Sequence, residues 1–159
     1  MLGKPDAGWT VFRLGSEETE YHLSYLNDVA LEWLIQAIHG LKTMDVFSVH
    51  GFCEPGRVIC TVSYWSCYVI FENEDREPEC YGVHHLHVPM IEFCKMLYRD
   101  ISDNLEEWVH WNTTLYEDDE KAVEAAFDER RKAIKQKLDE LRSLINENEE
   151  DFGENRCFF

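Results

Sequence analysis

Between residues 44 and 88, strand-forming stretches follow one another with only short turns between them. The stretches are residues 44–50, 57–71 and 80–88. The middle one is longer than a typical strand, so we divide it near Trp65 and Ser66 into two. Consecutive strands joined by short turns pair antiparallel, because a parallel connection needs a long crossover. This part of the chain therefore predicts an antiparallel sheet, which constrains the fold more than any other feature.

The residues before this segment predict a hairpin and a helix. Residues 9–14 are rich in strand formers, and alternating apolar residues in 19–25 indicate a second strand after a turn. Asn27 has the short polar side chain of a helix N-cap. In residues 28–41 apolar side chains recur at steps of three and four, which predicts a largely buried helix.

Two further helical patterns follow the sheet. The first begins at Pro89 and carries one apolar stripe as far as Trp108. The second, residues 115–146, starts after a capping box formed by Thr114 and Glu117. At a helical rise of 1.5 Å per residue it would be about 48 Å long, which is longer than a compact domain of this size is wide. We therefore expect this helix to extend beyond the domain, to be broken, or to pair with another chain. Its apolar stripe would allow a homodimer to form through it.

These patterns predict one α+β domain over residues 1–146 and an acidic, mobile tail over residues 147–159. The expected order is β-β-α-β-β-β-β-α-α, with a single antiparallel sheet packed by helices on one face. No apolar run is long enough to cross a membrane, and residues 1–9 lack the apolar stretch of a signal peptide. We therefore expect a cytoplasmic protein.

The six cysteines are expected to be reduced. Four of them lie in apolar strand or helix patterns, where free cysteine behaves as a small hydrophobic residue: Cys60, Cys67, Cys80 and Cys94. Without a secretion signal, a disulfide framework is not indicated.

The net charge of −17 is the main functional signal. Such a field repels nucleic acid and anionic membranes and attracts basic surfaces, so we expect a basic protein partner and neither nucleic acid nor membrane. Solubility alone is the competing explanation. Acidic candidates for partner contact lie in one loop and on the second helix, and tryptophan is enriched at interface centres. The candidates are Glu72, Glu74, Asp75, Glu77, Asp100, Asp103, Glu106, Glu107 and Trp111; for Trp111 a place in the core is the alternative.

Evidence for catalysis is sparse. Of the histidines at positions 84, 85 and 87, His85 and His87 share one strand face and are the candidates for metal ligands. No CxxC or HExxH motif accompanies them, and nucleophile-elbow and phosphate-binding motifs are absent. We therefore expect no metal, no other cofactor and no enzymatic activity. A small metal-dependent or hydrolytic enzyme using the strand of His84, His85 and His87 is the alternative, and an oligomeric scaffold held by the long helix is a third.

Three segments, together with the size and the charge, prompt a family comparison. Gly8-Trp9 opens the first strand, Tyr25-Leu26-Asn27-Asp28 opens the apolar helix, and Glu54-Pro55-Gly56 forms a strand turn. Over residues 8–111 the chain resembles the immunity proteins encoded beside bacterial polymorphic toxins, including those of contact-dependent growth inhibition systems. The resemblance implies a bacterial, cytoplasmic inhibitor that neutralises a basic toxin, such as a nuclease, by occluding its active site.

Overall fold

The strands form two antiparallel sheets in the computed structural model, which describes residues 1–15, 19–75, 78–111 and 120–154. A hairpin pairs β1 (Trp9–Phe12) with β2 (Tyr21–Ser24). The larger sheet has four strands in chain order: β3 (Phe47–Phe52), β4 (Arg57–Val62), β5 (Cys67–Glu72) and β6 (Pro78–Leu86). The expected α+β class is confirmed, and the strands that we placed in one sheet are divided between two.

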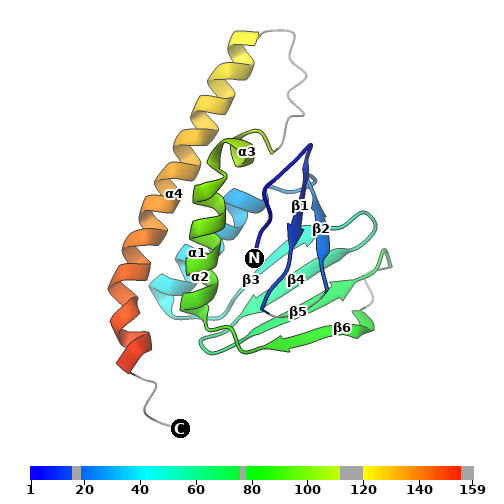
Figure 1. Ribbon diagram of the computed structural model, residues 1–159, viewed down its shortest axis with the longest axis vertical. Coiled ribbons are helices and arrows are strands. Elements are labelled where there is room, and N and C mark those ends of the chain that lie inside the picture. The colour runs from blue at the N-terminus through cyan, green and yellow to red at the C-terminus, as the bar shows by residue number, and fades with distance from the viewer. Residues whose placement is uncertain (16–18, 76–77, 112–119, 155–159) are drawn as a thin grey trace.

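Four helices complete the described chain (Figure 1): α1 (Val29–Thr43), α2 (Met90–Asp103), α3 (Leu105–Val109) and α4 (Glu120–Glu154). The cap of α1 is Asp28, whose carboxylate accepts a hydrogen bond from the Leu31 backbone N–H at 3.2 Å. The expected cap, Asn27, instead donates its side-chain amide to the His50 carbonyl. At Asn104 the backbone leaves the helical conformation, with φ −123°, so the single helix expected over 89–108 is two helices.

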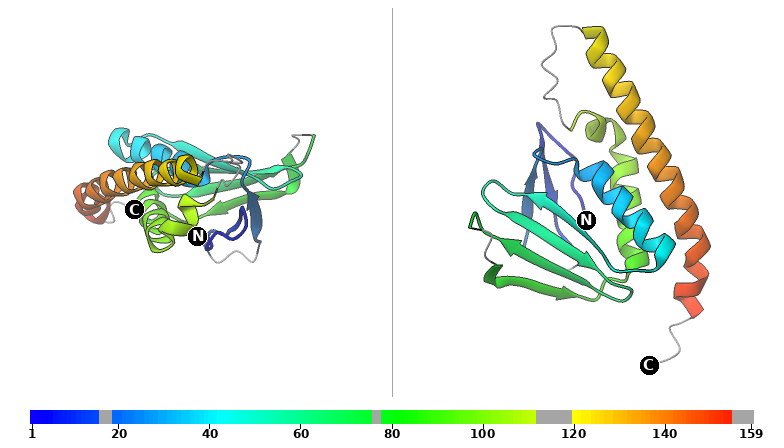
Figure 2. Two further views of the ribbon diagram at one scale, coloured as in Figure 1. Left: turned by 90° about the horizontal axis from the view of Figure 1, so that it is seen from above. Right: turned by 180° about the vertical axis from the view of Figure 1, so that it is seen from behind.

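Among the described residues, the larger sheet buries one of its faces, which we call the inner face. Along β3 and β4 buried residues such as Val49 and Cys60 alternate with more exposed ones. The β1–β2 hairpin lies against the inner face, and a Cβ atom on Gly51 would come within 2.8 Å of the Leu23 side chain. Phe93 of α2 packs its ring on that of Phe47, with centroids 5.8 Å apart. Figure 2 shows the hairpin on one side of the sheet and, from behind, strands that no helix crosses.

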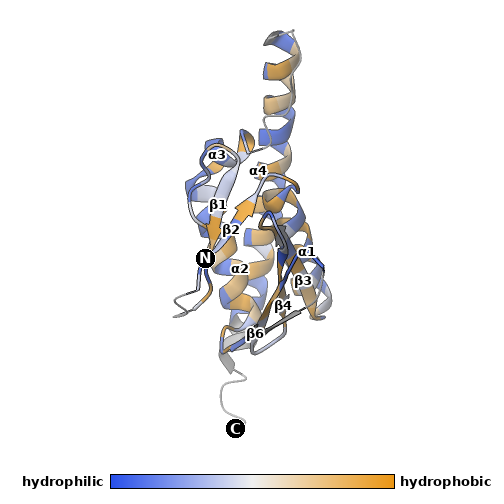
Figure 3. Ribbon diagram, turned by 90° about the vertical axis from the view of Figure 1, so that its right-hand side faces the viewer, coloured by the Kyte–Doolittle hydropathy of each residue, from blue (hydrophilic) through white to orange (hydrophobic). Residues whose placement is uncertain are grey.

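Helix α4 packs on other helices and does not touch the sheet's open side. Its apolar stripe is buried against α1 and α2 through Ile134, Leu138, Leu141 and Ile145. Hydrophobic and hydrophilic bands alternate along α4 in Figure 3, as this one-sided burial requires. The helix continues to Glu154, so residues 147–154 of the expected tail are helical. The stripe that suggested a homodimer is thus covered within the chain.

Arg130 interrupts that apolar stripe because it bonds to two other elements. One guanidinium nitrogen donates to the Asp28 carboxylate at 2.8 Å, and its Nε donates to the Trp108 carbonyl oxygen at 3.1 Å. The side chain therefore joins α4 to the start of α1 and the end of α3.

No described helix is both long and apolar enough to cross a membrane. Cys53, Cys60, Cys67 and Cys94 are free thiols. Burial raises the pKa of the Cys53 thiol to about 11, which makes it a poor nucleophile near neutral pH. Cys80 lies in β6, and Cys157 lies outside the described residues.

Replacing Leu141 by alanine tests whether the stripe is covered within one chain. Leu141 is fully buried, so its loss should lower the free energy of unfolding by about 2–5 kcal/mol in urea denaturation. The neighbouring exposed change Arg142→Ala should alter it by less than about 0.5 kcal/mol. Sedimentation should give the same mass for both variants and the wild type. A mass that halves in Leu141→Ala would show that the stripe joins two copies instead.

Candidate functional site

The uncovered outer face of the four-stranded sheet presents side chains in aligned rows. Strand register places outward residues of neighbouring strands opposite one another, where their side chains contact. The rows are Ser48, Thr61, Tyr68 and His85; His50, Ile59 and Ile70; and Phe52, Arg57 and Glu72. The first row lies toward the β4–β5 turn, the second crosses the middle of the face, and the third lies beside the β3–β4 and β5–β6 turns.

The centre of this outer face is apolar, although no described element covers it. Solvated faces of antiparallel sheets normally alternate to polar side chains. Here Ile59 and Ile70 stand in the centre, Tyr68 is 42% exposed, and Trp65 in the β4–β5 turn is also 42% exposed. Contiguous exposed apolar side chains with polar neighbours are typical of protein–protein contact surfaces. The outer face is therefore a candidate binding surface.

The histidines of β6 contribute to this face as ring stacks. His85 stacks on Tyr68 with centroids 4.8 Å apart, and His87 contacts His85 edge-on at 4.8 Å. His84 lies on the inner side, beside Phe12 and Tyr21. Among the described residues no group of three or more histidine, cysteine or carboxylate side chains is arranged to hold a metal ion. His85 and His87 thus share a face as expected, and the described geometry provides no third ligand.

A groove of about 360 Å³ lies at the end of the outer face, between the β3–β4 turn and the β5–β6 turn. Figure 1 places both turns at the end of the sheet that is remote from α4. Phe52 and Pro55 provide apolar walls, and Leu26 of the β2–α1 loop, which is 56% exposed, borders it. Glu54 and Glu74 line the same groove. We call these residues and this hollow the sheet-end groove.

The backbone of the β3–β4 turn fixes one wall of the groove. Gly56 has φ +91°, and a Cβ atom there would lie 2.4 Å from the Glu72 carbonyl oxygen on β5. Only glycine permits that close approach. Glu54 also has a positive φ of 43°, and the Cys53 N–H donates to the Gly56 carbonyl at 2.9 Å. The turn is thereby held against β5 with the Glu54 side chain exposed.

The charge of the groove is negative after its internal ion pair is counted. Arg57 pairs with Glu72, so these two charges offset each other. Within the part of the chain that the structure describes, neither Glu54 nor Glu74 forms an ion pair, and both are exposed, as is Asp75 beside them. Of the loop residues predicted from the sequence, Glu74 lines the groove, Glu72 and Asp75 lie within two residues of it along the chain, and Glu77 lies outside the described residues.

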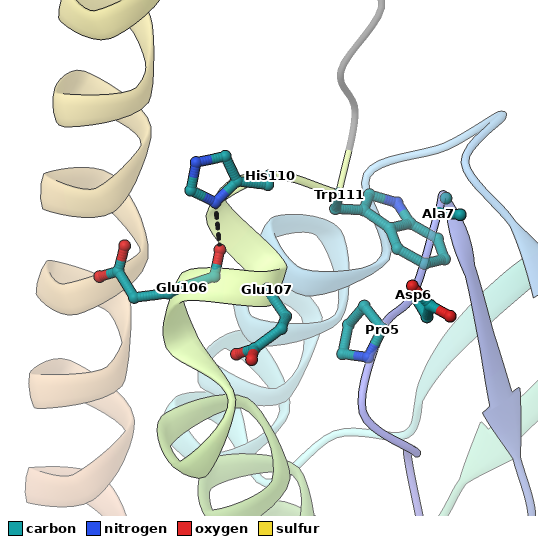
Figure 4. A pocket seen from close by; sticks show the side chains of 8 residues that line it. Pro5, Asp6, Ala7, Glu106, Glu107, His110 and Trp111 are labelled. Atoms are coloured by element: carbon teal, nitrogen blue, oxygen red, sulfur yellow. Dashed lines mark hydrogen bonds between the residues drawn. The ribbon is translucent and has the colours of Figure 1, made fainter.

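The second predicted acidic region, at α2 and α3, borders a separate hollow of about 350 Å³ (Figure 4). Two of its carboxylates, those of Glu106 and Glu107, are already paired within the chain. Glu106 accepts from Arg131 at 2.8 Å, and Glu107 pairs with Lys4 at 2.6 Å. These hydrogen bonds hold the pKa of each glutamate below its ordinary value. Of this set Asp103 is exposed without an ion pair among the described residues.

Asp100 and Trp111 require correction as contact residues, because both are buried. Asp100 accepts hydrogen bonds from the Leu2 backbone N–H at 2.9 Å and from Arg99. Trp111 is 1% exposed, and its indole N–H donates to the Asn27 carbonyl at 2.9 Å. Asp100 therefore fastens the N-terminal segment to α2, and Trp111 belongs to the core.

Sequence reasoning did not assign Leu26, Phe52 or Glu54 to the site. A signal was present for Phe52, because outward positions on β3, β4 and β5 carry Phe52, Ile59 and Ile70 where a solvated face would carry polar residues. The proximity of Leu26 and Glu54 depends on how the hairpin packs on the sheet, which no local pattern encodes.

Comparison with protein families, curated proteins and solved structures found no match to this chain. The site must therefore be interpreted from its own geometry.

The pairing of Glu107 with Lys4 can be tested by pH titration. Changing Lys4 to methionine removes the main cause of the lowered Glu107 pKa, so that pKa should rise toward its ordinary value. A lowered folded pKa stabilises the protein above the ordinary glutamate pKa, and this stabilisation is lost as the pH falls. Carboxyl carbon NMR measures the titration. Lys132→Met removes the same charge on α4 and should leave Glu107 unchanged; equal shifts in both variants would contradict the pairing.

Proposed function

We propose that the protein is a non-catalytic inhibitor that binds a basic partner protein through the outer face of its four-stranded sheet. The observation that carries the proposal is the combination of two properties on one surface. The outer face carries half-buried Ile59 and Ile70 beside exposed Tyr68, and its end carries Glu54 and Glu74, whose carboxylates have no ion-pair partner among the described residues. Apolar contact supplies affinity, and the charges select a basic partner.

The location of these carboxylates favours binding over solubility as the reason for the charge. Charges that serve only solubility are expected to be interspersed over the surface and to avoid exposed apolar patches. Here three exposed acidic residues, Glu54, Glu74 and Asp75, gather at two adjoining turns next to Leu26 and Phe52. A surface that is only solvated does not require acidic and apolar side chains to lie together. A contact with a basic protein uses both, the carboxylates for charge and the apolar side chains for burial.

Inhibition would follow from occlusion of the partner's own binding site. A protein that acts on nucleic acid carries a basic groove for phosphates, and a surface of carboxylates can occupy that groove in place of the substrate. The net charge of −17 would speed the encounter by long-range attraction. We therefore propose that it acts in the cytoplasm as an immunity-type inhibitor of a basic bacterial toxin, such as a nuclease.

Affinity capture from extracts of the native host at low salt provides the test. The immobilised protein should retain a basic protein that is released as ionic strength rises, because the Debye length falls from about 30 Å at 0.01 M to about 8 Å at 0.15 M. The purified partner should lose its activity at a one-to-one ratio, and its association rate should fall by about ten-fold or more over that salt range.

A pair of charge-matched variants separates local contact from the overall field. One variant neutralises Glu54, Glu74 and Asp75 as Gln, Gln and Asn. The other neutralises three exposed α4 carboxylates in the same way: Glu124, Glu129 and Asp139. Both carry the same net charge, so only the first should lose inhibition. Equal effects of the two, or a partner bound without salt dependence, would refute this mechanism.

A further inference from the structure

We infer that the sheet-end groove receives an arginine side chain of the basic partner. This inference rests on the proposed function and adds to it the residue type that the groove recognises. The groove joins an apolar part, made by Leu26, Phe52 and Pro55, to two carboxylates that have no ion-pair partner among the described residues. An occupant must therefore be apolar along its length and cationic at its end.

The apolar part of the groove matches the stem of a long basic side chain. Leu26 is 56% exposed and borders a hollow of about 360 Å³. A side chain that entered this hollow would cover Leu26. Lysine and arginine bury their methylene stems on such surfaces while the charged head remains among polar groups. A purely apolar occupant would bring Glu54 and Glu74 out of water without a partner, which is unfavourable.

The polar part favours arginine over lysine. Phe52 offers an aromatic wall, and a planar guanidinium stacks on aromatic rings, whereas an ammonium is more strongly hydrated. Five N–H donors allow a guanidinium to bond to carboxylates from two turns at once. Arg57 does not fill this role, because it is held on the sheet by Glu72 opposite to it in the register.

NMR titration of the full chain with short synthetic peptides tests the inference. The probe is the capped pentapeptide Gly-Leu-Arg-Leu-Gly, with citrulline or lysine replacing arginine in two matched peptides. Citrulline keeps the shape of arginine and removes its charge. The arginine peptide should shift the Leu26 methyl and Gly56 and Asn73 amide resonances, at least ten-fold more tightly than the citrulline peptide and more tightly than the lysine peptide.

Variants then identify the groups responsible. Glu54→Gln with Glu74→Gln should weaken the arginine peptide at least ten-fold, whereas Glu124→Gln with Glu129→Gln on α4 should leave it unchanged. Phe52→Leu should remove the preference for arginine over lysine. Equal binding of arginine and citrulline peptides, or shifts centred on the hollow at Asp6 and Glu107, would overturn the inference. If the protein inhibits a basic partner but the peptides cause no shift in the groove, the arginine site is refuted and the proposed function stands. If the arginine peptide binds the groove but no basic partner is found, the proposed function is refuted and the arginine site stands.

Discussion

The fold depends on a single aromatic anchor, Trp33 of α1, which joins the helices, the hairpin and the larger sheet. Its ring contacts Phe12 of β1 edge-on at 5.2 Å and stacks near Phe93 of α2 at 6.3 Å. Its indole N–H donates to the His50 carbonyl on the edge strand β3 at 2.8 Å. A buried tryptophan that satisfies its N–H in this way contributes both apolar burial and a fixed orientation. The two ring contacts lie on the inner side of the sheet, where the core forms, and the hydrogen bond fixes Trp33 to the edge of β3.

The placement of α4 reinforces this asymmetry. The longest helix could have covered the outer face of the sheet, but its apolar stripe and Arg130 bind it to α1, α2 and α3. The outer face therefore keeps Ile59, Ile70 and Tyr68 without a covering element from the described chain. The function that we propose follows from this distribution: the helices complete the core, and the opposite surface remains for a partner.

Local patterns predicted most of the elements, because period-two and helical repeats are encoded in neighbouring residues. They located the hairpin, the four strands of the sheet and the stripes of α1, α2 and α4. They did not predict that the strands divide into two sheets or that the helix breaks at Asn104, because tertiary packing determines both features. The burial of Trp111 and the ion pair of Glu107 with Lys4 join residues far apart in the chain. For the same reason the sequence suggested an acidic contact surface without indicating which of its carboxylates were already paired.

Side-chain footprinting of the protein alone and bound to its basic partner is the most direct test of the account. Hydroxyl radicals modify exposed aromatic and aliphatic side chains, and mass spectrometry measures the extent at each residue. We predict protection of Tyr68, Trp65 and Leu26 in the complex. Ile35 of α1 is also exposed and should be modified equally in both samples. Protection of Ile35 with continued modification of Tyr68, Trp65 and Leu26 would contradict the claim that the outer face of the sheet is the binding surface.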